Sequence, residues 1–166
     1  MAPISRASVA AGKTLGAATI AMIQGAIILL FAPLIGVSLS PGIVLRLLPL
    51  MFLLAIAMGS FGVLLATRIK TMEAFQAIMP MITFPMMFLS GVFFPVEEVP
   101  LWMSILTKIN PATYGIATIR QVALGGTTFE LNLFGYTMSL WNNVGILAAF
   151  GVVMILLAVR SFGSQE

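Results

Sequence analysis

The sequence predicts an all-α membrane protein with four transmembrane helices and a short helical hairpin on the outer side of the membrane. Two observations carry this prediction. The 166 residues are 60% hydrophobic and only 8% charged, whereas a soluble domain carries roughly 25% charged residues. In addition, four runs reach the length of about 20 mostly apolar residues that crossing the hydrocarbon requires. Because lipid offers no hydrogen bonds to an open backbone, each run is expected to be a helix.

The apolar runs are joined by short segments, without an internal repeat, a low-complexity tract or a flexible linker. A single transmembrane domain over residues 1–166 is therefore expected. The first run is longer than the core of a signal peptide and lacks a small-residue cleavage pattern after it, so no cleavable leader is expected. The four spans are expected at residues 15–37, 47–66, 74–94 and 138–159.

The basic residues predict the orientation of these spans. Four spans place both termini on the same side, and Arg46 lies in the short loop on the opposite side. The positive-inside rule weights short loops most and therefore places both termini in the cytoplasm, with the chain in the plasma membrane. The five basic residues expected on the cytoplasmic side are Arg6, Lys13, Arg68, Lys70 and Arg160.

The composition excludes several classes of function. The chain has no Cys, His or Asp, and its five Glu are scattered. Disulfides, thiol chemistry, most transition-metal sites and histidine acid–base catalysis are therefore excluded, and no cofactor or metal is expected. No span carries a nucleophile with a base, so an intramembrane enzyme is not expected. The eight basic residues form no cluster, so nucleic acid is not an expected partner, whereas membrane lipid is.

Residues 95–137 are too apolar for a solvated loop and too interrupted to span the membrane. Pro100 suits a first helical turn, and Asn110-Pro111 stops the helix that follows. A second helical stretch over 112–124 ends at two glycines. The pattern predicts an interfacial or re-entrant hairpin over 97–124; the alternative is an ordinary surface loop with chance periodicity. The apolar face of the first helix consists of Trp102, Ile105, Leu106 and Ile109.

The run from Phe84 to Arg120 contains a series of short motifs. A small-Gly pair is followed by Phe-Pro, then by Val-Pro with a nearby Trp, then by Asn-Pro-x-x-Tyr and a closing Arg. This order resembles the signature of ABC-2 type transporter permeases, although many members have Leu-Pro where this chain has Val99-Pro100. Arg120 is expected to tie the hairpin to a neighbouring polar group. The matching positions are Ser90, Gly91, Phe94, Pro95, Pro100, Trp102, Asn110, Pro111, Tyr114 and Arg120.

A second match lies at the start of the chain. Residues 1–13 are similar to the cytoplasmic coupling segment that joins two spans in this family and docks on the ATP-binding subunit. The resemblance implies that Pro3, Arg6, Gly12 and Lys13 contact the ATPase; plain positive-inside anchoring is the alternative for the two charges. The family normally has six spans and an N-terminal amphipathic helix. A chain that begins at the coupling segment reflects a start codon assigned too late, a split gene or a truncated one.

The resemblance implies ATP-driven export, in which two permease chains pair and two ATPase subunits supply the energy. Gly12-Lys13-Thr14 ends like a phosphate-binding loop, but Ala7 stands where that loop needs glycine. The leading hypothesis is export of a hydrophobic small molecule or drug. The alternatives are export of a polysaccharide or lipid-linked glycan, and a non-functional truncated fragment. An ATP-independent channel or secondary transporter is disfavoured, because such proteins often place ionisable residues inside their spans.

Three residues in the expected spans are candidates for a substrate path. Gln24 is an uncharged polar group at membrane depth, for which a hydrogen bond between helices is the alternative. Pro80 and Pro85 are expected to kink the third span and to free backbone carbonyls that serve gating. A purely structural kink is the alternative for both prolines.

Overall fold

The computed structural model describes residues 6–37, 39–93, 100–124, 132–133 and 136–163. Helices dominate these residues, as predicted, and two strands of two residues each are a small addition that the sequence did not indicate. These strands pair antiparallel before the last helix. The elements in order are α1 (Arg6–Phe31), η1 (Ala32–Ile35), α2 (Pro41–Arg68), α3 (Met72–Phe88), α4 (Leu101–Ile109), α5 (Pro111–Leu124), β1 (Asn132–Leu133), β2 (Tyr136–Thr137) and α6 (Leu140–Gly163).

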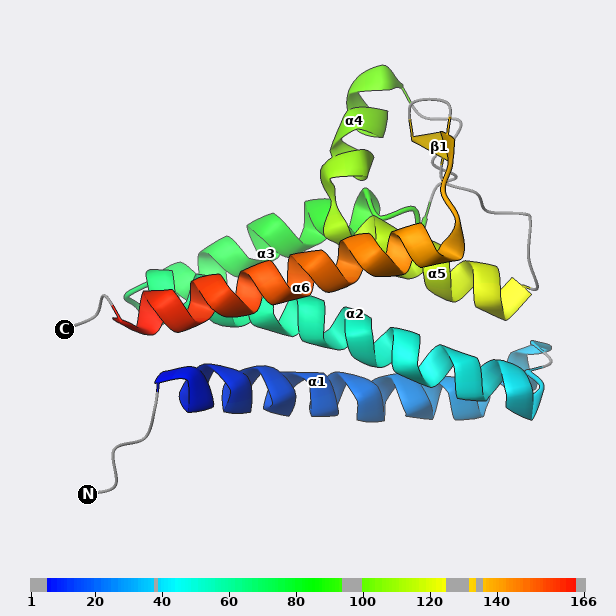
Figure 1. The fold of residues 1–166 in the computed structure, drawn as a ribbon, viewed down its shortest axis with the longest axis horizontal. Coiled ribbons are helices and arrows are strands. Elements are labelled where there is room, and N and C mark those ends of the chain that lie inside the picture. The colour runs from blue at the N-terminus through cyan, green and yellow to red at the C-terminus, as the bar shows by residue number, and fades with distance from the viewer. Residues whose placement is uncertain (1–5, 38, 94–99, 125–131, 134–135, 164–166) are drawn as a thin grey trace.

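Three described helices are long and apolar enough to cross a membrane, namely Ala7–Leu34, Pro41–Arg68 and Leu140–Ser161. They match the first, second and fourth expected spans and extend beyond them at one end or both. α2 is the central helix, since it packs against both α1 and α6 (Figure 1). Small residues allow this packing: a Cβ at Gly59 would lie 3.5 Å from the Thr14 carbonyl oxygen of α1.

The third expected span, over 74–94, is shorter in the structure. α3 has 17 residues, which corresponds to about 26 Å and falls short of the roughly 30 Å hydrocarbon core. The helix stops because a turn follows Phe88, in which Gly91 adopts a left-handed φ of 82°. Figure 1 shows that α3 ends before the far end of the bundle. The count of four spans is therefore not confirmed, and a fourth span stays a prediction.

Local capping explains where the long helices begin. Ser40 is the N-cap of α2, where its hydroxyl accepts a hydrogen bond from the Ile43 amide at 3.3 Å and Pro41 takes the first helical position. Thr71 caps α3 in the same way by accepting from the Ala74 amide at 3.2 Å. Two ordinary N-caps therefore set the entry points of α2 and α3.

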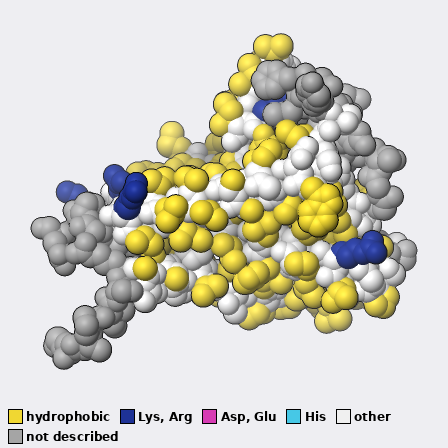
Figure 2. Space-filling view, viewed as in Figure 1, with side chains coloured by type: hydrophobic (Ala, Val, Ile, Leu, Met, Phe, Trp, Pro, Cys, Tyr) yellow, Lys and Arg dark blue, Asp and Glu magenta, His cyan; other side chains and the backbone are white. Residues whose placement is uncertain are grey.

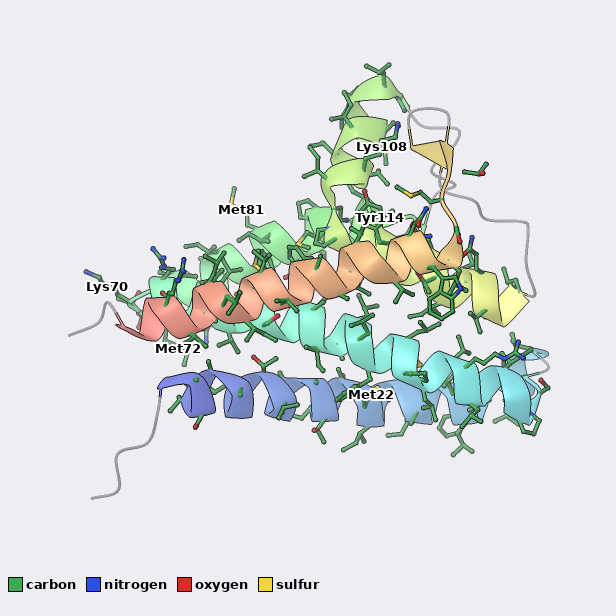
Figure 3. The ribbon with its side chains drawn as sticks, viewed as in Figure 1. Met22, Lys70, Met72, Met81, Lys108 and Tyr114 are labelled. Carbon is green, nitrogen blue, oxygen red and sulfur yellow. The ribbon has the colours of Figure 1, made fainter. Side chains whose placement is uncertain are left out.

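The first turn of α1 and the last turn of α6 lie at the same end of the bundle (Figure 1). Arg68 ends α2 and Arg160 is in the last turn of α6, so basic side chains gather at this end, where Lys70 also lies (Figure 3). Arg46 lies near the opposite end of α2. Figure 2 shows a surface between these ends that is largely hydrophobic. This distribution fits helices that stand in a bilayer with charged ends in water.

The hairpin follows the expected pattern with small shifts in its bounds. α4 begins at Leu101, with Pro100 as its N-cap, and residues 94–99 lie outside the described residues. α5 begins at Pro111, one residue earlier than expected. α4 stands away from the bundle, whereas α5 runs along α2 and α6 towards the end opposite the termini (Figure 1). Tyr114 and Ala117 of α5 form a buried cluster with Met138 and Ile146.

Candidate functional site

The junction between α4 and α5 closes the C-terminal end of α3. Asn110 is 6% exposed, and its side-chain Nδ2 donates a hydrogen bond to the Met86 carbonyl oxygen of α3 at 2.7 Å. Its Oδ1 accepts from the Ala112 amide at 3.1 Å, so Asn110 is also the N-cap of α5 with Pro111 in the first helical position. The backbone amide of Asn110 ends α4 by bonding to the Leu106 carbonyl at 3.1 Å. One residue therefore joins three helix ends.

Two hydroxyls complete the closure of α3. Thr113 is 1% exposed and donates to the Leu89 carbonyl at 3.3 Å and to the Thr107 carbonyl at 2.9 Å. Ser90 is also 1% exposed and donates to the Met87 carbonyl at 2.6 Å. The last carbonyls of a helix have no partner within it. These side chains supply partners for carbonyls at the end of α3 and in the turn after it.

Tyr114 fastens the two hairpin helices to each other. Its hydroxyl donates to the Lys108 carbonyl at 2.5 Å, and burial raises the pKa of the phenol above its ordinary value of 10.0. Further along α5, Arg120 donates to the Val92 carbonyl at 3.4 Å, a contact that joins α5 to the turn after α3. The hairpin is thus connected to α3 at both the Asn110 end and the Arg120 end.

Two apolar cavities lie beside α3, and no residue of α3 is buried. One has a volume of about 360 Å³ and lies between α2, α3 and α5. The other has a volume of about 240 Å³ and reaches α6 at Phe150. Phe61 of α2 and Met86 of α3 line both. α3 is therefore held firmly at its C-terminal end and packed loosely along its length.

Similarity to known proteins identifies the family of this chain. A family model described as the ABC-2 type transporter matches residues 1–124. The chain belongs to the ABC-2 type transporter family. It is 28% identical to a putative transport permease ycf38 of Cyanophora paradoxa over 95% of this chain and 56% of the relative. It is 28% identical to nodulation protein J of Rhizobium meliloti over 67% of this chain and 39% of that protein.

A nodulation protein J of Rhizobium leguminosarum bv. viciae is 24% identical over 93% of this chain and 56% of its own length. The chain thus spans about half the length, or less, of these curated relatives. No solved structure matches.

The structure brings together most positions of the ABC-2 motif. Gly91, Asn110, Pro111, Tyr114 and Arg120 all lie around the end of α3 or on the hairpin beside it. Pro95 lies outside the described residues. Pro100 and Trp102 belong to α4, away from this junction, and Trp102 is 63% exposed. The residues of the apolar face predicted for α4 are exposed, although Leu106 and Ile109 also line the smaller cavity, whereas Thr107 on the same helix is buried.

The residues expected on a substrate path are not gathered in one place. Gln24 is exposed on α1, so its amide faces away from the described bundle. Pro80 and Pro85 lie inside α3 and are exposed as well. Pro85 lines the smaller cavity. Both prolines remain helical members of α3, and they leave the carbonyls one turn before them without the usual amide donor.

The segment expected to couple the ABC-2 protein to an ATPase is continuous with α1. Pro3 lies outside the described residues, and Arg6 is the first residue of α1. Gly12 and Lys13 are exposed on this helix about two turns later. The boundary expected at residue 14, between a coupling segment and a span, therefore does not interrupt the helix. The reason is that residues 6–14 contain no helix breaker stronger than Gly12.

Sequence reasoning missed two buried residues near this site. Thr113 belongs to no motif. Its position in the first turn of the helix that begins at Pro111 could have indicated a hydroxyl near a helix end. Asn143 lies in the first turn of α6 and belongs to no motif either. It is fully buried in α6, and neither its side-chain oxygen nor its nitrogen has a hydrogen-bond partner among the described residues.

Proposed function

We propose that this chain is the membrane-spanning permease subunit of an ATP-binding cassette exporter. It moves a hydrophobic small molecule or drug across the plasma membrane, and a separate ATPase subunit supplies the energy. Membership of the ABC-2 type transporter family supports the transport role. The substrate class is supported by the chemistry of the described helices, as follows.

The observation that carries the substrate class is how polar side chains are used inside the bundle. Ser60 donates to the Ile56 and Ala57 carbonyls of its own helix at 2.8 and 2.9 Å. Thr67 of α2 donates to the Ser161 hydroxyl of α6 at 2.9 Å. Such bonded groups offer little to the many hydroxyls of a glycan, because recognition of a polar substrate requires hydrogen-bonding groups without a partner. Asn143 of α6, whose side-chain amide has no partner among the described residues, is an exception.

The charges in the described long helices lie near their ends. Lys13, Arg46, Arg68, Glu73 and Arg160 are all within about two turns of a helix terminus. The middle of the described bundle therefore presents an apolar route. A hydrophobic compound has few hydrogen bonds to water to give up, so the protein does not have to replace them when the compound enters this apolar region.

The proposed complex contains two ATPase subunits and a second permease chain. The end of the bundle with both termini carries exposed basic residues, among them Lys13, Arg68, Lys70 and Arg160. We assign this end to the cytoplasm and to the ATPase contact, since positive loops stay inside. The proposed contact residues are Pro3, Arg6, Gly12 and Lys13.

The test is co-expression with the ABC ATPase encoded nearest to this chain, followed by co-purification in mild detergent. Gly12→Leu is the informative variant, because a Cβ at Gly12 meets no atom within 4 Å and the fold is left intact. Gly16→Leu, one turn further and equally open, is the matched control. Loss of the ATPase with Gly12→Leu and its retention with Gly16→Leu is the expected result. Absence of any ATPase on a folded wild-type chain refutes the assignment to an exporter.

Substrate class is tested in inside-out vesicles that contain the complex. ATP-dependent accumulation of a hydrophobic dye is expected, and its dependence on ATP distinguishes an exporter from a channel. Accumulation of a lipid-linked glycan with no uptake of the dye contradicts the proposed substrate. In that case the permease belongs with glycan exporters.

A further inference from the structure

The larger cavity beside α3 is an elongated cleft. Its wall on α3 is formed at every turn of one helical face from Met79 to Met87, over a rise of about 12 Å. The opposite wall comes from α2, at Met58, Phe61 and Gly62, and from α5, at Ala112 and Ile116. A cavity of about 360 Å³ with this length suits an extended chain rather than a compact ring system. The lining residues on α3 are Met79, Ile82, Thr83, Met86 and Met87, and the turn after α3 adds Ser90 and Val92.

The chemistry of the walls selects hydrocarbon. No residue that lines the cleft is charged. Its two hydroxyl residues are Thr83 and Ser90, and Ser90 already donates to the Met87 carbonyl at 2.6 Å. A bound water needs two to four polar partners, so the cleft does not hold ordered water. Methionine contributes four of the lining side chains, and its flexible thioether adapts to chains of different shape.

The position of the cleft determines which hydrocarbon reaches it. It runs along α3, of which no residue is buried, and Met81 on the same helix points away from the bundle with 78% exposure (Figure 3). α3 therefore has lipid-facing residues next to a partly open cleft. In a bilayer the hydrocarbon at that opening is the acyl chain of a lipid, which is present at the concentration of a solvent.

We propose that the cleft between α2, α3 and α5 holds one acyl chain of a membrane lipid, which fills the space that separates α3 from the bundle. The inference requires that α3 stands in the bilayer, as the predicted third span does, and it does not depend on which compound is exported. Transfer from lipid to the cleft brings no hydrophobic gain, because lipid tails are as apolar as the walls. Occupancy comes from dispersion contacts that an empty cleft forfeits and from the abundance of lipid.

Gly62 provides a way to close the cleft without disturbing the fold. It lines the cleft on α2, and a Cβ built there meets no atom within 4 Å. Gly62→Leu therefore places a side chain in the space assigned to lipid, and it improves helix propensity rather than weakening it. Gly145→Leu is the matched control, because Gly145 is an exposed glycine of α6 with equally open surroundings that does not line the cleft.

The experiment uses the full chain in vesicles of phosphatidylethanolamine and phosphatidylglycerol. The probe is a phosphatidylcholine with a diazirine in the middle of one acyl chain. After irradiation, adducts are mapped by mass spectrometry at Met79 and Met86 in the cleft and at Met81 on the lipid-facing side. The wild type is expected to be labelled at all three. Gly62→Leu is expected to lose most labelling at Met79 and Met86 and to keep that at Met81, while Gly145→Leu matches the wild type.

Three results overturn the proposal. The first is labelling at Met81 alone in the wild type, which means that no acyl chain enters. The second is equal labelling of Met79 and Met86 in the wild type and Gly62→Leu. The third is loss of labelling at Met79 and Met86 when a hydrophobic transport substrate is added before irradiation, which assigns the cleft to the exported compound. Circular dichroism on both variants confirms that the helices are intact, so a loss of adducts reports on the cleft.

Discussion

Replacing Asn110 with alanine removes a side chain that joins the end of α3 to the start of α5. The Nδ2 bond to the Met86 carbonyl at 2.7 Å disappears, and so does the Oδ1 bond from the Ala112 amide at 3.1 Å. With Asn110 only 6% exposed, water does not readily replace either bond. The end of α3 is expected to loosen, because α3 has no buried residue to hold it elsewhere.

The magnitude follows from the two bonds. Loss of the N-cap of α5 costs about 1 kcal/mol, and a buried carbonyl left without a partner costs about 1–3 kcal/mol. Together, Asn110→Ala is expected to destabilise this region by roughly 2–4 kcal/mol. A loss of about 3 kcal/mol raises the equilibrium constant for local opening of this helix end by a factor of about 100. Asn110→Ser keeps an N-cap acceptor but does not reach Met86, so only the larger part of the loss is expected.

The assay is hydrogen–deuterium exchange in detergent micelles. The reporters are the amides of Leu89 and Ser90, which bond to the Pro85 and Met87 carbonyls in the last turn of α3. Asn142→Ala is the control, because Asn142 is an exposed asparagine on α6. Exchange of the reporters in Asn110→Ala at the same rate as in Asn142→Ala refutes the reasoning. It shows that Asn110 does not hold the end of α3.

Three further predictions concern the packing and protonation of the same helices. Gly91→Ala is expected to lower the free energy of unfolding by about 1–2 kcal/mol, because Gly91 has a φ of 82° and a Cβ is disfavoured in that region. Reversible SDS denaturation measures this change, and an unchanged stability contradicts the left-handed turn. Gly59→Ala is expected to be tolerated, since its Cβ lies 3.5 Å from the Thr14 carbonyl, whereas Gly59→Leu forces α1 from α2 at a cost of about 1–3 kcal/mol; equal melting temperatures for the two variants argue against this contact. Burial raises the pKa of Tyr114 above 10.0, so its contribution to stability is fully present below that pH and falls as the pH rises above it. Tyr114→Phe is expected to flatten this alkaline loss in the free energy of unfolding, and an unchanged slope shows that another group is responsible.

Much of the candidate site was predictable from local patterns. Asn110-Pro111 reads as a helix stop followed by a helix start, and the structure has a C-cap and an N-cap there. The role of Asn110 towards Met86 was not predictable, because the two residues are 24 positions apart and only the fold brings them to 2.7 Å. Thr113 was missed for the same reason, since its partner Leu89 is also 24 residues away.

The sequence by itself determined the class of the protein. Whether an apolar run enters the membrane depends on its length and on nearby charges, and not on which other segments pack against it. Long apolar runs require helices in lipid, and Ser40 and Thr71 placed two helix starts through local bonds. Only the tertiary structure decided that α3 stops at Phe88 and that a cleft lies between it and the bundle. Hydropathy is a sum over single residues. The end of a helix and a cavity depend instead on tertiary contacts with side chains from distant segments of the chain.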